Sequence, residues 1–246
     1  MFVHNINPVL LDLGPLQIRY YGLFYVVGFI LAYFILQKIS NLSKERIEDL
    51  LVYAGVSGII GARVFYILAY NLPFYLKNPF EIFAVWHGGL SFHGSLIGSV
   101  IGVYLFSKKY KQDFLHLLDR LSVPFILGLA IGRIGNFING ELVGRITDVS
   151  WCFDFGDKLC RHPSQLYESF YSFFIFFVLW NLRNKKMKKG TIVSLFVILY
   201  SSLRFLTEFF RQPDPQIGFI VGLTLGQWLN MAMFVIGLYL LYKIRK

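Results

Sequence analysis

Leu118–Phe137 reads LDRLSVPFILGLAIGRIGNF, an apolar stretch with few polar residues. Its length of about 20 residues is what an α-helix needs to cross the hydrocarbon core of a membrane. Six other stretches along the chain have a similar length and character, so we expect seven transmembrane helices. They are Ile18–Leu36, Leu50–Tyr70, Leu90–Phe106, Leu118–Phe137, Leu166–Leu182, Thr191–Phe210 and Leu223–Tyr242.

The composition of the whole chain supports this interpretation. Its 246 residues are 56% hydrophobic and only 15% charged, and the mean hydropathy is +0.56. Soluble domains carry about a quarter charged residues, so most of this chain lies where charge is costly. We therefore predict an all-α integral membrane protein that forms one transmembrane domain over residues 1–246.

The basic residues indicate which ends of the predicted helices face the cytoplasm. The segments after the first, third, fifth and seventh stretches hold 14 of the 24 lysines and arginines, whereas the opposite side holds six. Because cytoplasmic loops carry the excess of Lys and Arg, we expect the N-terminus outside and the C-terminus inside. Residues 139–163 then form a small cap on the outer side.

The net charge of +10 does not indicate nucleic-acid binding. A nucleic-acid surface combines basic residues with interleaved aromatic residues, whereas the aromatic residues here lie inside the apolar stretches. The two cysteines, Cys152 and Cys160, both lie in the predicted cap. Two free thiols and one disulfide are equally compatible with that spacing, and together with His162 the cysteines give only a weak metal pattern. We expect no metal and no cofactor.

Polar residues gather toward the outer ends of the predicted helices. In Thr191–Phe210 and just beyond it, five of them fall within about 100° of one another on a helix that turns 100° per residue. These are Tyr200, Arg204, Thr207, Glu208 and Arg211. Arg133 and Asn136 form an i,i+3 pair on another outward-running helix, and His93 lies near the outer end of a third.

Ionisable residues at such a depth are costly and usually mark function. Two or more guanidinium groups in one outward-facing pocket suit an anionic lipid headgroup, because they bind phosphate in a bidentate manner. In the alternative interpretation, the arginines pair with Glu208 or Glu141 and only hold helices together. A lipid or solute transporter is a second alternative, but transporters often show paired repeats with midplane sites, and neither feature is visible here.

Residues 132–145, GRIGNFINGELVGR, resemble the signature of the prolipoprotein diacylglyceryl transferases. Four other segments also resemble that family, and they occur in the family's order along almost the whole chain. They are Tyr20–Gly22 (YYG), Gly88–Gly94 (GGLSFHG), Arg161–Glu168 (RHPSQLYE) and Glu208–Asp214 (EFFRQPD).

The resemblance implies seven helices and a periplasmic cap in the bacterial cytoplasmic (inner) membrane, with the active site toward the outer leaflet. It implies transfer of the diacylglyceryl group of phosphatidylglycerol to the lipobox cysteine of preprolipoprotein signal peptides. A thioether forms and glycerol phosphate leaves, which is the first step of bacterial lipoprotein maturation. The short cap departs from the family's pattern and leaves its role in admitting the peptide open, and His87 receives no role.

The resemblance places the family's lipid-binding arginine on Arg133 and its functionally important histidine on His93. We expect His93, Arg133 and Arg204 to be catalytic. His93 can accept the thiol proton or orient the headgroup through a hydrogen bond, and both roles stay open. The expected substrate-binding residues are Arg133, Asn136, Tyr21, Asn139, Glu141, Gly144, Tyr200, Glu208 and Arg211.

Overall fold

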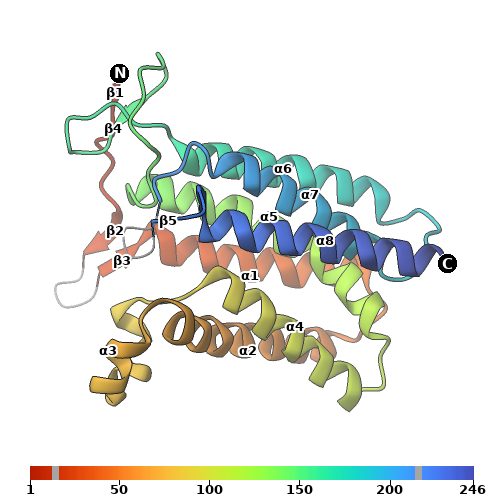
Figure 1. Ribbon diagram of the computed structural model, residues 1–246. Helices are drawn as coiled ribbons and strands as arrows, with labels where there is room; N and C mark the ends of the chain where they lie inside the picture. The colour runs from red at the N-terminus through yellow and green to blue at the C-terminus, as the bar shows by residue number, and fades with distance from the viewer. Residues whose placement is uncertain (13–16, 214–217) are drawn as a thin grey trace. The chain divides into compact units, whose positions relative to one another are not determined.

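The computed structural model describes residues 1–12, 17–213 and 218–246. These residues are mostly helical, and the chain divides into two compact units (Figure 1). The first unit comprises Met1–Ile39 and Asp119–Lys246, and the second comprises Ser40–Leu118.

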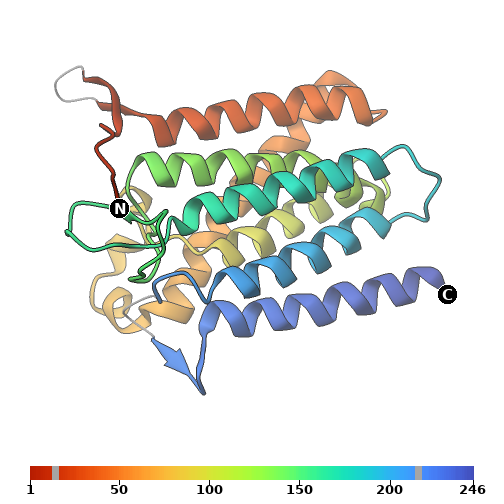
Figure 2. The same cartoon turned by 90° about the horizontal axis from the view of Figure 1, so that it is seen from above.

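The first unit contains five long helices. They are α1 (Tyr20–Ile39), most of α5 (Phe114–Ile138), α6 (Ser164–Leu182), α7 (Thr191–Thr207) and α8 (Leu225–Arg245). Figures 1 and 2 show α6, α7 and α8 running side by side, and α7 packs against both of the others.

The second unit is built on two helices that lie against each other, α2 (Lys44–Tyr70) and α4 (Phe92–Lys109). Between them come α3 (Leu72–Lys77) and the 3-10 helices η1 (Pro79–Ile82) and η2 (Val85–His87). Glycines allow the close approach of α2 and α4. A Cβ atom on Gly98 would lie 2.1 Å from the Ser57 carbonyl oxygen, and one on Gly61 would lie 2.4 Å from the Gly94 carbonyl oxygen. Small residues of this kind are typical of helices that pack inside membranes.

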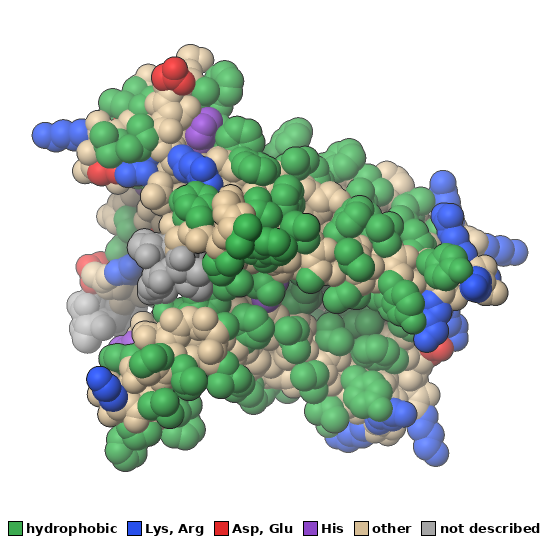
Figure 3. All heavy atoms as spheres, viewed as in Figure 1, with side chains coloured by type: hydrophobic (Ala, Val, Ile, Leu, Met, Phe, Trp, Pro, Cys, Tyr) green, Lys and Arg blue, Asp and Glu red, His purple; other side chains and the backbone are tan. Residues whose placement is uncertain are grey.

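Each of the seven predicted transmembrane stretches coincides over most of its length with one of these long helices. Within the described residues, four helices are long and apolar enough to cross a membrane, namely α1, α2, α5 and α8, and α7 is a shorter apolar helix. Their outer faces carry large exposed side chains such as Phe34, Leu68 and Val235. On the face drawn in Figure 3, hydrophobic side chains cover the long helices, and basic side chains gather where α8 ends. Hydrophobic exposure on this scale is that of a membrane protein.

The connections contain short strands, which the prediction of an all-α chain missed. Three two-stranded ribbons are present in the described parts of the chain: parallel β1–β4, antiparallel β2–β3 and antiparallel β5–β6. Their bounds are Phe2–Val3 (β1), Val9–Asp12 (β2), Gln17–Arg19 (β3), Phe153–Asp154 (β4), Phe219–Ile220 (β5) and Leu223–Thr224 (β6). Ribbons of two to four residues leave too short an alternation of polar and apolar residues to be recognised.

Residues 139–163 fold as a loop segment tied down at several points. Cys152 and Cys160 form a disulfide with a Cα–Cα distance of 5.3 Å, which decides between the two states that the sequence left open. Next to it, β4 pairs with β1 at the N-terminus, and Phe2 and Phe153 face each other with ring centroids 5.3 Å apart. The predicted cap is therefore joined to the first residues of the chain.

A buried carboxylate fixes the start of α7. Asp119 on α5 accepts hydrogen bonds from the backbone N–H groups of Gly190 at 2.7 Å and Val193 at 2.8 Å. The first N–H groups of a helix have no partner within the helix, and a negative charge also suits that end of the helix dipole. The contact anchors α7, which carries Arg204 close to its other end.

Candidate active site

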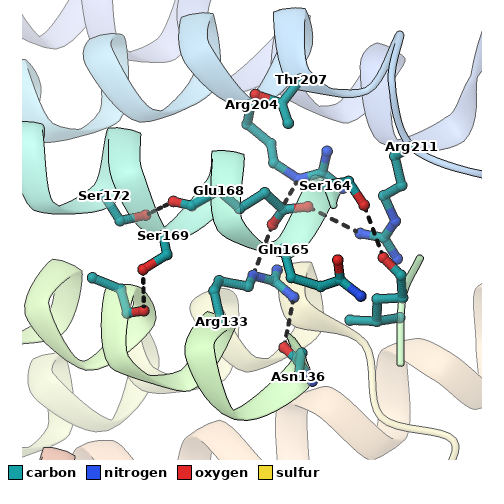
Figure 4. Close-up of polar contacts among 12 residues, drawn as sticks. Arg133, Asn136, Ser164, Gln165, Glu168, Ser169, Ser172, Arg204, Thr207 and Arg211 are labelled. Carbon is teal, nitrogen blue, oxygen red and sulfur yellow. Dashed lines mark hydrogen bonds and ion pairs between the residues drawn. The ribbon is translucent and has the colours of Figure 1, made fainter. Parts of the chain in front are cut away.

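Three arginines and two glutamates form a largely buried cluster between α5, α6, α7 and the segment that follows α7. Figure 4 shows Arg133, Glu168, Arg204 and Arg211. We call Arg133, Glu168, Arg204, Glu208 and Arg211 the arginine–glutamate cluster. Glu168 is 2% exposed and lies at its centre. Its Oε2 is 2.7 Å from Arg133 Nε and 4.0 Å from Arg204 Nε, and its Oε1 is 3.8 Å from Arg211 Nη1.

The cluster residues that α7 and its C-terminal end contribute are spaced so that they lie on one face of the helix. Arg204 and Glu208 are four residues apart and form an ion pair through Arg204 Nη1 and Glu208 Oε2. Tyr200 and Thr207 are buried on the same stretch, as the predicted polar stripe requires. Glu208 Oε1 also accepts a hydrogen bond of 3.0 Å from Thr224 Oγ1, directly before α8.

Arg211 reaches the cluster by a different route from the one predicted. The predicted stripe assumed that the helix continues past Phe210, but α7 ends at Thr207. An antiparallel bridge between Gly144 and Arg211 holds the chain there instead. Burial and the positive charge of Arg204 lower the pKa of Arg211, so a bound anion would favour its charged form.

Asn136 and Glu141 extend the cluster toward the surface. Arg133 Nη1 donates to Asn136 Oδ1 at 3.1 Å, which confirms the predicted i,i+3 contact. Asn136 Nδ2 then donates to Glu141 Oε2 at 3.4 Å, and Asn139 Nδ2 donates to Glu141 Oε1 at 3.2 Å. The described hydrogen bonds of the exposed Glu141 carboxylate thus come from side-chain amides. The arginines of the cluster form their ion pairs with Glu168 and Glu208 instead.

Gly144 lies where three backbone segments meet. Its N–H donates to the His162 carbonyl oxygen at 3.0 Å, next to the bridge with Arg211. A Cβ atom at this position would lie 2.4 Å from the His162 oxygen and 2.7 Å from the Phe210 oxygen. Only glycine fits, because both neighbours are backbone atoms.

The two predicted tyrosines lie in aromatic surroundings. Tyr200 is 2% exposed, stacks on Phe196 with ring centroids 5.8 Å apart and meets Tyr171 edge-on at 6.1 Å. Tyr21 shares a hydrogen bond of 2.7 Å with the Tyr25 hydroxyl. A Cβ atom on Gly135 would lie 3.2 Å from the Tyr21 ring, so α1 and α5 approach closely there.

His93 belongs to the second unit, where it is the second residue of α4. The segment that leads to it is held by Arg63, which is 4% exposed. The Arg63 guanidinium donates to five backbone carbonyls and lies over the Tyr75 ring. The acceptors are the carbonyls of Glu81, Ile82, Ala84, Gly88 and Gly89. This polar residue of the second helix therefore shapes the loop before α4.

Glu168 is the cluster residue that the sequence interpretation did not select. It was visible as a carboxylate near the start of the largely apolar stretch Leu166–Leu182, which is a costly placement. With Glu168 included, three guanidiniums face two carboxylates, and the cluster keeps one net positive charge in a largely buried place. Such a site suits a ligand with one negative charge, such as a phosphodiester. In the described residues, no group of three or more His, Cys, Asp or Glu side chains is arranged to hold a metal.

Comparison with known proteins identifies the family. The profile of the prolipoprotein diacylglyceryl transferases matches residues 8–243. The chain belongs to this family. It is 43% identical over 249 residues to the phosphatidylglycerol–prolipoprotein diacylglyceryl transferase of Rickettsia felis, with 96% of both chains covered. The enzymes of the same name from Rickettsia typhi and Legionella pneumophila are 43% and 41% identical, and the matches cover 99% and 96% of each chain.

Within this transferase fold, Gly144→Ala is expected to lower both the melting temperature and the activity. The added methyl group must displace backbone on two sides. Overpacking of this kind costs about 1–3 kcal/mol and moves the bridge that places Arg211. Thermal unfolding of the purified protein and a transferase assay measure the two effects.

Gly128→Ala is the matched control for that prediction, because a Cβ atom there meets nothing within 4 Å. It should leave melting temperature and activity close to wild type, since alanine is also the better helix former. Equal behaviour of the two variants would contradict the assigned role of Gly144.

Proposed function

We propose that this chain transfers the diacylglyceryl group of phosphatidylglycerol to the lipobox cysteine thiol of preprolipoprotein signal peptides. Membership of the transferase family supports the reaction, and the names of the relatives supply phosphatidylglycerol and prolipoprotein as substrates. The observation that carries the proposal is the net positive charge of the arginine–glutamate cluster, which matches the single negative charge of a phosphodiester.

The chemistry is a displacement at a carbon of the lipid glycerol. The cysteine sulfur forms a bond to that carbon, and the carbon–oxygen bond to phosphate breaks. Glycerol phosphate leaves with the electron pair, and the thiol proton passes to a base. Negative charge grows on the leaving phosphate, so cations aimed at it bind the transition state more tightly than the bound lipid.

We assign this stabilising role to Arg133 and Arg204, whose forked guanidiniums suit phosphate oxygens. Asn136 and Glu168 hold Arg133 in place, and Glu208 holds Arg204. Arg211 adds the third positive charge. Tyr21, Asn139, Glu141, Gly144 and Tyr200 complete the proposed substrate-binding residues.

His93 fits two roles in this scheme. An unperturbed histidine has a pKa near 6.5, so it can take the proton of a cysteine thiol, whose unperturbed pKa is near 8.5. It can equally donate a hydrogen bond that orients the lipid headgroup. In the structure His93 is the second residue of α4, directly after the loop that Arg63 binds.

The membrane arrangement is part of the proposal. Residues 1–246 form one catalytic domain that spans the bacterial inner membrane seven times, with residues 139–163 as a periplasmic cap. The N-terminus faces the periplasm and the C-terminus the cytoplasm. The 14-to-6 distribution of basic residues supports this orientation, and it puts the arginine–glutamate cluster toward the outer leaflet.

Thiol labelling tests the orientation. Single cysteines at Asn78 and Asp157, with Cys152 and Cys160 replaced, should react with a membrane-impermeant reagent in cells with a permeable outer membrane. Cysteines at Gln112 and Asn184 should react only after lysis. Labelling of either in intact cells overturns the proposed orientation.

The reaction itself is tested with purified protein, phosphatidylglycerol and a lipobox peptide. The expected product is a peptide heavier by one diacylglyceryl group, joined through a thioether that mass spectrometry detects. A peptide with serine in place of the lipobox cysteine is the control and should stay unmodified. A lipid carrier with the same cationic cluster would leave the cysteine peptide unmodified too, and that outcome would refute the transferase proposal.

A further inference from the structure

Gln165 places a buried hydrogen-bond acceptor beside the arginine–glutamate cluster. It lies in the first turn of α6, three residues before Glu168, and is 1% exposed. Residues three apart share a helix face. In Figure 4 the Gln165 amide extends from α6 between the side chains of Arg133 and Arg211.

One half of this amide is already engaged. Gln165 Nε2 donates to the backbone carbonyl oxygen of Glu141. Because a carbonyl only accepts, this contact decides which end of the amide is nitrogen. Gln165 Oε1 is buried and has no hydrogen-bond partner in the described part of the chain. Buried acceptors without a donor are rare and costly, so Gln165 Oε1 is available to accept a hydrogen bond from a ligand bound at the cluster.

The surrounding side chains define what that partner is. Guanidinium groups only donate hydrogen bonds. Arg133, Arg204 and Arg211 therefore suit phosphate oxygens but cannot accept a hydrogen bond from a hydroxyl group. The carboxylates of Glu168 and Glu208 are paired with the arginines. Among the described residues, Gln165 Oε1 is a neutral buried acceptor without a hydrogen-bond partner, on the same helix face as Glu168, so it suits a neutral donor next to a bound phosphate.

We propose that Gln165 Oε1 accepts a hydrogen bond from a hydroxyl of the headgroup glycerol of phosphatidylglycerol. The inference rests on the proposed function and adds to it a residue that selects the leaving group. Phosphate alone is shared by all phospholipids, whereas the headgroup hydroxyls distinguish this one. Asn139 Oδ1 is also buried without a hydrogen-bond partner among the described residues, but the Asn139 residue is partly exposed, whereas Gln165 is 1% exposed.

The test compares two lipids with the same acyl chains in the full-length purified protein. One is phosphatidylglycerol, and the other is phosphatidylpropanol, in which a propyl group replaces the headgroup glycerol. A site that binds a substrate hydroxyl strongly rejects the analogue without it. We expect wild type to favour phosphatidylglycerol by at least about tenfold in kcat/KM for thioether formation. In Gln165→Met the ratio should fall toward one, because the rate with phosphatidylglycerol falls more than the rate with phosphatidylpropanol.

Two further variants separate recognition from folding. Ser169→Ala removes a buried hydrogen bond of 2.8 Å from the same helix to the Ala130 carbonyl, and should change both rates equally. Gln165→Glu keeps an acceptor oxygen, so it should keep the ratio of the two kcat/KM values although both rates fall. If Gln165→Met does not fold, the ratio in Gln165→Glu tests the inference instead. Equal losses for both lipids in Gln165→Met, or a lost ratio in Gln165→Glu, overturn the inference. If wild type forms no thioether with either lipid, the proposed function fails and this inference with it.

Discussion

Glu168→Gln is expected to lower the melting temperature strongly and to remove most of the transferase activity. Its carboxylate lies within 4.0 Å of nitrogen atoms of Arg133, Arg204 and Arg211, and it is 2% exposed. Removing one partner of a buried ion pair leaves an uncompensated charge and costs about 3–5 kcal/mol. Glutamine keeps the shape of the side chain, so the loss reports charge and not packing. Thermal unfolding in detergent and thioether formation measure the two effects.

Asp157→Asn is the matched control, because it also removes one carboxylate from an arginine pair. Asp157 Oδ2 lies 2.6 Å from Arg161 Nε, but this pair is at the surface of the cap. Exposed ion pairs contribute little to stability, so the control should melt close to wild type. If Glu168→Gln shifted the melting temperature no more than Asp157→Asn, the cluster would be hydrated, and its net charge could not act as argued above.

The long helices could be predicted from sequence because each is largely one apolar run, and among the described residues α1, α2, α5 and α8 are long and apolar enough to cross a membrane. Contacts within one helix were predictable for a similar reason. Arg133–Asn136 and Arg204–Glu208 are i,i+3 and i,i+4 pairs, which helical periodicity brings together without knowledge of the rest of the chain.

Contacts between distant segments were not predictable in this way. Glu168 meets Arg133 and Arg204 across three helices, and no periodicity in the sequence relates these positions. The pairing of Phe2 with Phe153 is equally remote in sequence and involves only two residues of each strand. Arg211 was selected correctly as a neighbour of the cluster but on a wrong assumption, since the chain leaves the helix at Thr207 and returns through the bridge to Gly144.

The second large effect is expected for Arg204→Ala, which should lower the rate of thioether formation at saturating lipid by at least about 10²-fold. This is the scale seen when one preorganised donor to a developing negative charge is removed. Binding of phosphatidylglycerol should weaken less, because Arg133 and Arg211 stay in place and the lost interaction is strongest in the transition state. Single-turnover kinetics give the rate, and titration of the lipid against the melting temperature gives the binding.

A double variant separates the chemical role of Arg204 from its structural one. Arg204→Ala alone also leaves the Glu208 carboxylate buried without its partner, since the two are paired in wild type. Arg204→Met combined with Glu208→Gln removes both charges and keeps an oxygen that can accept from Thr224 Oγ1, as Glu208 Oε1 does at 3.0 Å. Replacing a buried ion pair by neutral side chains is often neutral for stability, so the double variant should recover much of the lost melting temperature. Its rate should stay at least about 10²-fold below wild type. If rate and stability returned together, Arg204 would act by holding α7 in place, and Arg133 would be left to stabilise the departing phosphate.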